Sequence, residues 1–394
     1  MIYLDNAGTT KVSDEAIKSM MPYFNNIYGN ASSLHSVGQI AKEHLELARD
    51  RIAKCINANS NEIYFTSGGS ESDNWAINTA CKYAKLVHKK HIITSAFEHH
   101  AILNTLKEKE KEGFEVTYLP VNKNGIIDIN DLKKYITNDT FLVTIMFANN
   151  EIGTIQPIEE IGKICRENKI LFHTDAVQAV GHIPVDVVKQ NIDMLSVSGH
   201  KFHGPKGTGL MYCRKNCPLY PFVLGGSQEK NKRAGTENIA GIVGMSIALE
   251  NAVQEMDEVS QKEIKLRNRL FEELSKIPHS KINGDVVNRL PNNFNMCFEG
   301  IEGESLLLLL DDKGICASSG SACTSGSLDP SHVLLAIGLP HEVAHGSLRL
   351  TLSKYNTEEE IEYTIKSVIE VVNYLRSISP VWDELEKGVR KYAL

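Results

Sequence analysis

Long apolar runs are missing from the sequence. The longest unbroken run of leucine spans only residues 306–310, and Asp311 and Asp312 follow it directly. A membrane-spanning helix needs about 18 or more apolar residues, so we expect no membrane partner. The opening MIYLDNAGTT also lacks the basic segment, apolar stretch and cleavage site of a secretory signal peptide. We therefore expect a cytoplasmic protein.

Basic charge is also scarce. The chain has 42 Lys and Arg residues against 49 Asp and Glu residues, which gives a net charge of −7. A protein that binds nucleic acid through electrostatics needs a basic face, so we expect no nucleic-acid partner. No repeat or low-complexity tract interrupts the 394 residues. The glycine-containing segment TSGGSES at residues 66–72 matches neither the P-loop nor the dinucleotide-binding fingerprint.

The eight cysteines form no dense framework, and a chain of this size needs no disulfides to fold. We expect reduced thiols. Only Cys213 and Cys217 lie close together, and without a second pair they make a weak zinc motif. These two residues and the 14 histidines are the only support for one alternative, a non-catalytic scaffold with a structural metal.

Short apolar runs alternate with longer amphipathic stretches between residues 60 and 215. This alternation predicts a mostly parallel sheet with helical crossovers. The runs are rich in β-branched residues and lack period-2 polarity, which is typical of strands covered on both faces. They occupy residues 63–67, 91–95, 115–119, 141–146, 170–174, 193–198 and 209–213.

The pattern changes after about residue 230. Residues 236–276 read as long helices, and the rest as a smaller α+β unit in which Thr357 and Glu360 form a capping box for a helix through about residue 376. We predict a large cofactor-binding domain of residues 15–255. Residues 1–14 and 256–394 would form the small domain, with a functional loop at about 318–330.

The first chemical signal is SGHKFHGPKG at residues 198–207. It follows a predicted buried strand, so Lys201 stands at a strand exit. This lysine is either an exposed side chain in a turn or, in a desolvated pocket, an amine that forms a Schiff base. In the second case Ser198 and His200 are free to face an anion.

The second signal is HTDAVQ at residues 173–178, again at the end of a strand. Ligands of α/β sheets gather at the carboxyl ends of strands. Asp175 either caps the next helix or pairs with the pyridine nitrogen of pyridoxal phosphate, whose positive charge lets the ring accept electrons.

Three further strand exits carry polar side chains. TSGGSES at 66–72 places small residues and hydroxyls before a helix, where free N–H groups bind phosphate, although any helix N-terminus can have this composition. EHH at 98–100 offers histidines for acid–base work or stacking, and we expect only one of the two in the site. NNE at 149–151 offers amide donors at the same edge.

The last signal is ASSGSACTSGS at residues 317–327, where small residues surround Cys323. A buried structural cysteine has packing neighbours. A thiol among small residues instead suits a nucleophile that must visit two places. The alternative is an incidental cysteine in a linker.

In this order the motifs resemble the cysteine desulfurases of the NifS/IscS type, pyridoxal-phosphate enzymes of the class V branch. The resemblance runs from YLDNAGTT at the start to SLRLTLS at 347–353, and SGHKFHGPKG with SSGSACTSG is its most specific part. It implies an α/β protein of the type I pyridoxal-phosphate-dependent transferase fold. Such a fold has a large, mostly parallel seven-stranded sheet domain and a smaller α+β C-terminal domain.

The resemblance also assigns roles, position by position. Lys201 is the Schiff-base lysine, Cys323 is the catalytic cysteine, and His99 stacks on the cofactor ring and handles protons. Asp175 pairs with the ring nitrogen, Gln178 bonds the phenolic oxygen, and Asn150 and Arg349 hold the substrate carboxylate. The remaining cofactor contacts are Gly69, Ser70, Ser198, His200 and, from the other subunit, Thr236. No metal ligand is expected, although Cys323 could touch a cluster during sulfur transfer.

The implied reaction converts L-cysteine to L-alanine and leaves the sulfur on Cys323 as a persulfide. The implied partners are a second copy of the chain and a sulfur acceptor such as an iron–sulfur scaffold. Other class V enzymes, an aminotransferase or a selenocysteine lyase, are the alternatives, but an aminotransferase has no need of the Cys323 loop. The tail at 379–394 either docks a partner or covers the small domain.

Overall fold

A seven-stranded sheet organises the larger part of the chain. The structure is a computed structural model that describes residues 1–319 and 330–394. Six of the strands run in one direction, and only β8 is reversed, pairing antiparallel with β2 and β7. In sheet order they are β2 (Ile63–Thr66), β8 (Gly209–Cys213), β7 (Met194–Ser198), β6 (Leu171–Asp175), β5 (Thr140–Thr144), β3 (His91–Ser95) and β4 (Glu115–Leu119).

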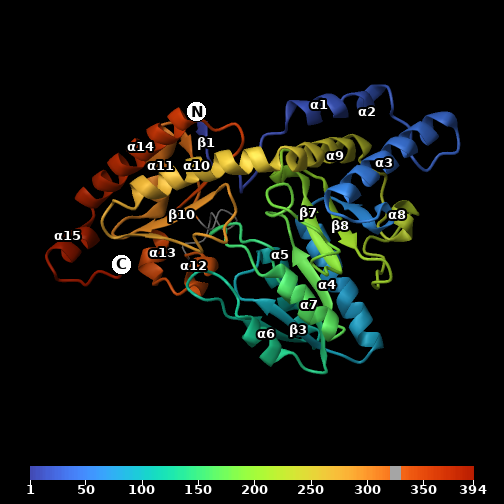
Figure 1. The fold of residues 1–394 in the computed structure, drawn as a ribbon, viewed down its shortest axis with the longest axis horizontal. Coiled ribbons are helices and arrows are strands. Elements are labelled where there is room, and N and C mark those ends of the chain that lie inside the picture. Colours follow the sequence, from blue (N-terminus) through green and yellow to red (C-terminus); the bar gives the residue numbers. More distant parts are fainter. Residues whose placement is uncertain (320–329) are drawn as a thin grey trace.

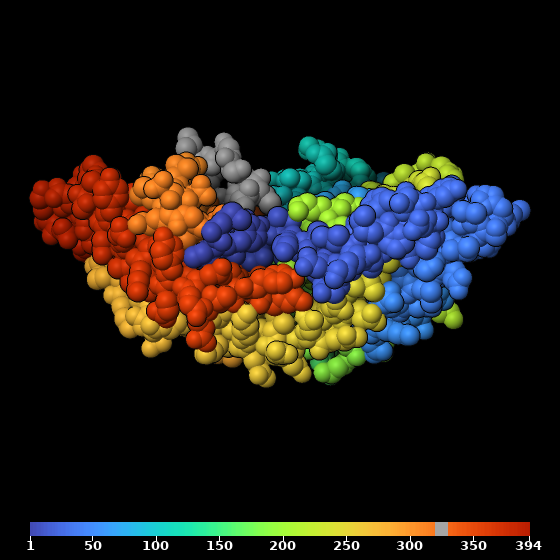
Figure 2. Space-filling model, turned by 90° about the horizontal axis from the view of Figure 1, so that it is seen from above, coloured from blue at the N-terminus to red at the C-terminus, as the bar shows by residue number. Residues whose placement is uncertain are grey.

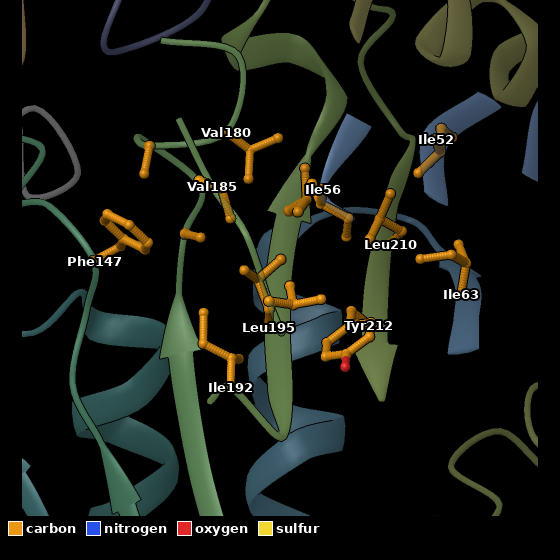
Figure 3. Close-up of a cluster of buried hydrophobic side chains, with 14 of the residues drawn as sticks. Ile52, Ile56, Ile63, Phe147, Val180, Val185, Ile192, Leu195, Leu210 and Tyr212 are labelled. Atoms are coloured by element: carbon orange, nitrogen blue, oxygen red, sulfur yellow. The ribbon is translucent and has the colours of Figure 1, made fainter. Parts of the chain in front are cut away.

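Helices cover both faces of this sheet, which explains why the strands read as continuous apolar runs (Figure 1). One hydrophobic cluster joins the sheet to α3, α7 and α9, and Figure 3 shows part of it, with Leu195 on β7 and Leu210 and Tyr212 on β8. A second cluster joins the other face to α4 and α5. The helices around this sheet are α1 (Asp14–Met20), α2 (Pro22–Asn25), α3 (Ser36–Cys55), α4 (Gly69–Leu86), α5 (His100–Lys111), α6 (Ile129–Tyr135), α7 (Ile158–Glu167), α8 (Gln228–Asn231) and α9 (Ile239–Gln254).

The direction of the strands decides where the loops meet. Because β2, β3, β5, β6 and β7 all run the same way, their carboxyl ends lie along one edge of the sheet. The helices that follow β2 and β3 begin at this edge, and the polar segments after β5, β6 and β7 lie there too. Ligands of α/β sheets bind at such an edge.

A second, smaller unit contains the three-stranded sheet of β12 (Ser347–Thr351), β10 (Asn293–Phe298) and β9 (Ser280–Ile282), in that order. Its own hydrophobic cluster packs this sheet against α10, α11 and α14. The predicted capping box is confirmed, because Thr357 and Glu360 make both of its hydrogen bonds. The helices are α10 (Met256–Leu274), α11 (Gly303–Asp312), α12 (His332–Ala336), α13 (His341–His345), α14 (Glu358–Ser377) and α15 (Pro380–Glu386).

The first residues join the two units. Strand β1 (Ile2–Tyr3) pairs with β11 (Ile315–Cys316) in a two-stranded parallel sheet. A few residues later Thr10 donates its backbone N–H to the carbonyl of His200, at the edge of the large sheet. Figure 2 shows this segment in dark blue, lying between the red C-terminal helices and the lighter blue residues that follow it. The predicted domain boundaries, 15–255 against 1–14 and 256–394, stay a prediction.

No helix among the described residues is long and apolar enough to span a membrane. The C-terminal residues fold back onto the small unit. The ring of Tyr392 stacks on His279 with centroids 3.5 Å apart, and the backbone N–H of Ala393 donates to Glu299 at 2.7 Å.

Candidate active site

A single pocket collects most of the predicted site residues. It has a volume of about 300 Å³ and lies where the carboxyl ends of the large sheet meet the small unit. Cavities of this size hold small molecules and cofactors. Ten of the twelve predicted residues line it: Gly69, Ser70, His99, Asn150, Asp175, Gln178, Ser198, His200, Lys201 and Arg349. Their individual roles remain predictions.

The start of α4 supplies one wall of the pocket. Gly68 precedes the helix and makes no side-chain cap, so the first N–H groups of an 18-residue helix have no capping side chain. There is no room for a side chain at Gly69, because a Cβ atom there would lie 2.6 Å from Val177 Cγ2. The bare backbone therefore faces the pocket, which is how a helix N-terminus binds phosphate.

Two side chains from the end of β7 complete this cradle. Ser198 is buried and ends the strand, and His200 follows it in a short 3₁₀ turn. The Nδ1 atom of His200 lies 3.1 Å from Thr9 Oγ1. Burial, together with nearby Lys201 and Lys206, lowers the pKa of His200 to about 4. The ring is therefore neutral near pH 7 and can offer a hydrogen bond without adding charge.

Two buried carboxyls lie at the floor of the pocket. Asp175 ends β6 and accepts a hydrogen bond from the N–H of Val177 at 2.9 Å, while Asp73 comes from α4. Burial raises the pKa of both, and the charge of Asp175 raises that of Asp73 further. Among the described residues, Asp73 Oδ1 has no hydrogen-bond partner. A ligand with a positive charge would compensate this acidic floor.

A histidine from the segment that follows β3 faces the carboxyls. His99 caps α5, and its Nδ1 accepts the N–H of Ala101 at 3.1 Å, so the neutral ring carries its proton on Nε2. Burial lowers the pKa of His99. One nitrogen of His99 and one oxygen each of Asp73 and Asp175 lie within 4.8 Å of one another. This spacing would also suit a metal ion, but the cradle and the lysine beside it better fit an organic phosphate with a protonated ring.

The expectation that only one of the two adjacent histidines belongs to the site is wrong. His100 also lines the pocket, and its ring centroid lies 6.4 Å from that of His99. His332 from α12 lines the same wall, with its ring centroid 4.7 Å from that of His100. The two adjacent side chains thus diverge and still reach one cavity.

Lys201 ends the turn after β7, and its amine points to the N-terminal segment. The Nζ atom donates to the carbonyl oxygens of Ala7 and Gly8, the latter at 2.8 Å. Gln178 Nε2 also donates to Ala7 O, at 3.1 Å. Backbone carbonyls therefore aim the amine and the amide side chain into the pocket.

Arg349 on β12 brings a positive charge from the small unit. Its side chain is 2% exposed, with Nη2 paired to Asp5 Oδ1 at 2.9 Å and Nη1 donating to the carbonyl of Asn150 at 3.1 Å. Within the described part of the chain, its Nε has no partner. A buried guanidinium with a spare donor suits a carboxylate ligand.

Two predicted residues are not in the pocket. Thr236 is exposed and does not line it. Cys323 lies outside the described residues. The last residues before that gap are placed, however: Ser318 N donates to Arg349 O at 3.2 Å, and Arg349 N donates to Ser318 O at 2.7 Å.

The sequence analysis missed several lining residues. Ala7 and Gly8 act through backbone carbonyls, for which no side-chain signal exists. Asp73 lies inside α4 and looks like a solvated acid in the sequence, where it directly follows the motif TSGGSES. Glu151 and His332 also line the pocket, and the adjacency of Glu151 to Asn150 is the one signal that could have found it.

Cys213 and Cys217 do not gain a third metal-ligating neighbour. Their thiols contact each other, and this hydrogen bond, with burial, raises the pKa of Cys217. Among the described residues they belong to no group of three or more ligating side chains. The geometry therefore gives the scaffold alternative no support.

The known proteins that this chain resembles are consistent with the residues found in the pocket. Residues 2–364 match the model of the class-V aminotransferase family, so the fold and the pocket are those of a pyridoxal-phosphate enzyme of class V. The chain is 54% identical over 380 residues to cysteine desulfurase IscS of Methanosarcina thermophila, which covers 96% of this chain and 94% of the relative. It is 52% identical over 390 residues to cysteine desulfurase IscS of Clostridium botulinum, with 98% of each chain covered.

Solved structures give the same result. A NifS-like protein superimposes with a TM-score of 0.90 and 41% identity over 95% of this chain and all of that one. SspA, solved in complex with cysteine, superimposes with a TM-score of 0.80 and 37% identity over 91% of this chain and all of that one. The chain belongs to the cysteine desulfurases of the class V aminotransferase family. The predicted α/β fold, with its seven-stranded mostly parallel sheet and smaller sheet unit, is confirmed.

Proposed function

We propose that the pocket takes L-cysteine, releases L-alanine and leaves the sulfur on Cys323 as a persulfide. The observation that carries this proposal is the convergence of Lys201, Asp175 and Arg349, from three separate segments, on one cavity beside a bare helix N-terminus. An amine, a buried acid and a carboxylate-binding guanidinium are the groups that a pyridoxal-phosphate enzyme needs for an amino-acid substrate.

Pyridoxal phosphate fits the donor set. The N-terminus of α4, with Ser70, Ser198 and His200, would hold its phosphate, and the acidic floor at Asp175 would hold its ring nitrogen. When bound there, the cofactor supplies an electron sink for the pair left on a substrate carbon when a bond to that carbon breaks. Arg349 and Asn150 would hold the substrate carboxylate and so fix which bonds of the amino acid face Lys201.

The chain's own groups then move a proton and a sulfur atom. Lys201, whose amine lies beside the carbonyls of Ala7 and Gly8, takes the proton from the substrate Cα. The thiolate of Cys323 attacks the substrate sulfur. An S–S bond forms and the Cβ–S bond breaks with its electron pair left on Cβ. Two protons then complete alanine, one on Cβ and one returned to Cα through Lys201; they are the proton first taken from Cα and the proton that Cys323 gave up on forming its thiolate.

The reach of the chain supports this role for Cys323. Its upstream flank is fixed at Ser318, which pairs with Arg349, and downstream His332 lines the pocket. Only five residue steps separate Ser318 from Cys323, and a fully extended chain covers at most about 3.6 Å per residue, or about 18 Å in all. This length is compatible with a thiol that reaches the substrate-binding side of the pocket.

Replacing the thiol tests the proposal. Cys323→Ser should keep the yellow absorbance of the bound cofactor and lose alanine formation from L-cysteine. Cys55→Ser, a half-buried cysteine of α3 that does not line the pocket, is the matched control and should turn over normally. Undiminished alanine formation by Cys323→Ser would reject the proposal. Alanine that forms only when a keto acid is added would favour an aminotransferase.

We also propose that the protein is a homodimer and that Thr236 serves the pocket of the partner. Large apolar side chains are exposed between the end of α1 and the start of α3, among them Met21, Phe24, Tyr28 and Leu34. Burying such a surface is favourable, and a second copy is the occupant that would also bring Thr236 to a phosphate. Sedimentation should give twice the 43.8 kDa chain mass, and Thr236→Ala should weaken cofactor binding.

The physiological sulfur acceptor follows from the relatives. Because they are named IscS, we propose that the persulfide supplies iron–sulfur cluster assembly in the cytoplasm. The tail from residue 379 packs on the small unit through Tyr392 and Ala393, which favours a covering role over a free docking arm. Co-purification of acceptor proteins with and without residues 387–394 tests the docking alternative.

A further inference from the structure

Helix α12 lies directly behind the pocket, on the downstream side of Cys323. Its buried side chains Val333 and Leu334 belong to a hydrophobic cluster with Phe97, Met146 and Ile152. Phe97 precedes His99 by two residues, and Ile152 follows Asn150 by two. The small unit is therefore packed onto the two loops of the large sheet that carry a predicted ring contact and a predicted substrate contact.

Ser331 fixes the start of this helix. Its Oγ accepts the N–H groups of Val333 at 3.1 Å and Leu334 at 3.3 Å. A hydroxyl has only one proton to donate, and here it is donated to the carboxyl of Glu151. Glu151 is 5% exposed, adjoins Asn150 and lines the pocket, so Ser331 ties the helix to the substrate side of the cavity.

His332 makes a second contact between α12 and the loops of the large sheet. Its Nε2 lies 2.9 Å from the backbone carbonyl of Glu98. A carbonyl can only accept, so Nε2 carries the proton and donates it. The ring packs against His100 with centroids 4.7 Å apart, and Glu98 immediately precedes His99. The imidazole is therefore anchored to a loop that is itself fixed by His99, which caps α5.

We propose that His332 is a positioning residue for sulfur transfer, fixing the downstream end of the segment that bears Cys323 to the pocket wall through the carbonyl of Glu98. This inference rests on the proposed role of Cys323. The upstream end is held in the same way, by the two backbone hydrogen bonds between Ser318 and Arg349. Both described flanks of the segment are therefore held at the pocket wall, and holding reacting groups near each other is a general way to raise their effective concentration.

A positioning role for His332 predicts that its replacement slows the reaction of L-cysteine but not that of L-cysteine sulfinate. L-Cysteine needs attack by a thiol, whereas L-cysteine sulfinate loses sulfur dioxide with the bonding pair left on Cβ and needs none. His332→Phe keeps an aromatic ring against His100 but removes the donor. It should lower alanine formation from L-cysteine about tenfold, as expected for the loss of one buried hydrogen bond, and leave turnover of the sulfinate within twofold. His332→Gln, which retains an N–H donor, should recover most of the loss.

Control measurements distinguish a loss of positioning by His332 from misfolding or loss of the cofactor. His341→Phe alters an exposed histidine of α13, outside the pocket, and should leave both reactions unchanged. Melting temperatures and cofactor absorbance show whether His332→Phe folds, and deuterium exchange at Cα of L-alanine gives a second comparison that is independent of the thiol.

The experiments distinguish failure of the role proposed for His332 from failure of the proposed function. Equal losses on both substrates, or no loss on either, would overturn the positioning role of His332, as would a His332→Gln variant as slow as His332→Phe. If Cys323→Ser forms alanine from L-cysteine at the normal rate, the proposed function itself fails, whatever the histidine variants do.

Discussion

The buried carboxyl of Glu98 gives a sharp test of the electrostatics behind the pocket. Glu98 is fully buried and accepts hydrogen bonds from Ser95 Oγ and, at 2.9 and 3.0 Å, from the N–H of Met146. Burial nevertheless raises the pKa of Glu98 from 4.5 to about 8, with a further contribution from Asp175. We predict that Glu98→Gln makes the protein more stable than the unsubstituted chain at alkaline pH.

The sign follows from proton linkage. Between pH 4.5 and about 8 the folded protein holds one proton at Glu98 that the unfolded chain has lost, so the free energy of unfolding falls as the pH rises. Each pKa unit is worth about 1.4 kcal/mol, which gives a loss of up to about 5 kcal/mol across this window. With an unfolding entropy of about 2.1 cal/mol/K per residue over the whole chain, the loss corresponds to about 6 °C in melting temperature.

Calorimetry of the cofactor-loaded protein at pH 5.5, 7 and 8.5 measures this effect. Between pH 5.5 and the pKa of about 8 the loss is about 3.5 kcal/mol, so the melting temperature of Glu98→Gln, taken relative to that of the unsubstituted protein, should rise by up to about 4 °C between the two extremes. Titrating groups that do not interact with Glu98 are common to both proteins and cancel. A difference that stays constant within 1 °C would refute the reasoning, because it would mean that Ser95 and Met146 keep the carboxylate ionised throughout.

Three further predictions concern the pocket. Arg349→Lys keeps the charge but loses the planar fork, so KM for L-cysteine should rise about tenfold or more while cofactor absorbance is unchanged; an unaltered KM in steady-state kinetics would remove Arg349 from substrate binding. Gly69→Ala would place a Cβ atom 2.6 Å from Val177 Cγ2, and titration with pyridoxal phosphate should show at least tenfold weaker affinity. A normal titration curve would mean that the start of α4 does not approach the phosphate. Lys201→Ala should lose the yellow absorbance of the Schiff base, and its persistence in the spectrum would contradict the assignment.

The strands of the large sheet could be predicted because burial on both faces determines the residues of each strand separately. Strands buried on both faces must be apolar throughout, and the seven predicted runs match β2 to β8. The first and last residues of each strand were harder to predict. The apolar run at 141–146 suggests that the strand begins and ends later than β5 does, at Thr140 and Thr144. Met146 is as buried as a strand residue because it lies under α12, and burial alone does not distinguish the two cases.

Part of the site was predictable for a geometric reason. Parallel strands present their carboxyl ends together, so Asp175, Ser198 and Lys201 could be placed at one edge from strand order alone. The sequence could not reveal contacts made by backbone carbonyls, such as those of Ala7 and Gly8. Nor does periodicity distinguish a helical acid at a pocket floor, such as Asp73, from one in solvent.

The ion pair between Asp5 and Arg349 spans 344 positions of the chain. During synthesis the amino-terminal segment leaves the ribosome first, yet Arg349 and the residues around it emerge almost last. The lysine-bearing edge of the large sheet can therefore fold early, but the cavity is completed only when nearly the whole polypeptide is available. A nascent chain, however well formed its first unit, holds no finished catalyst.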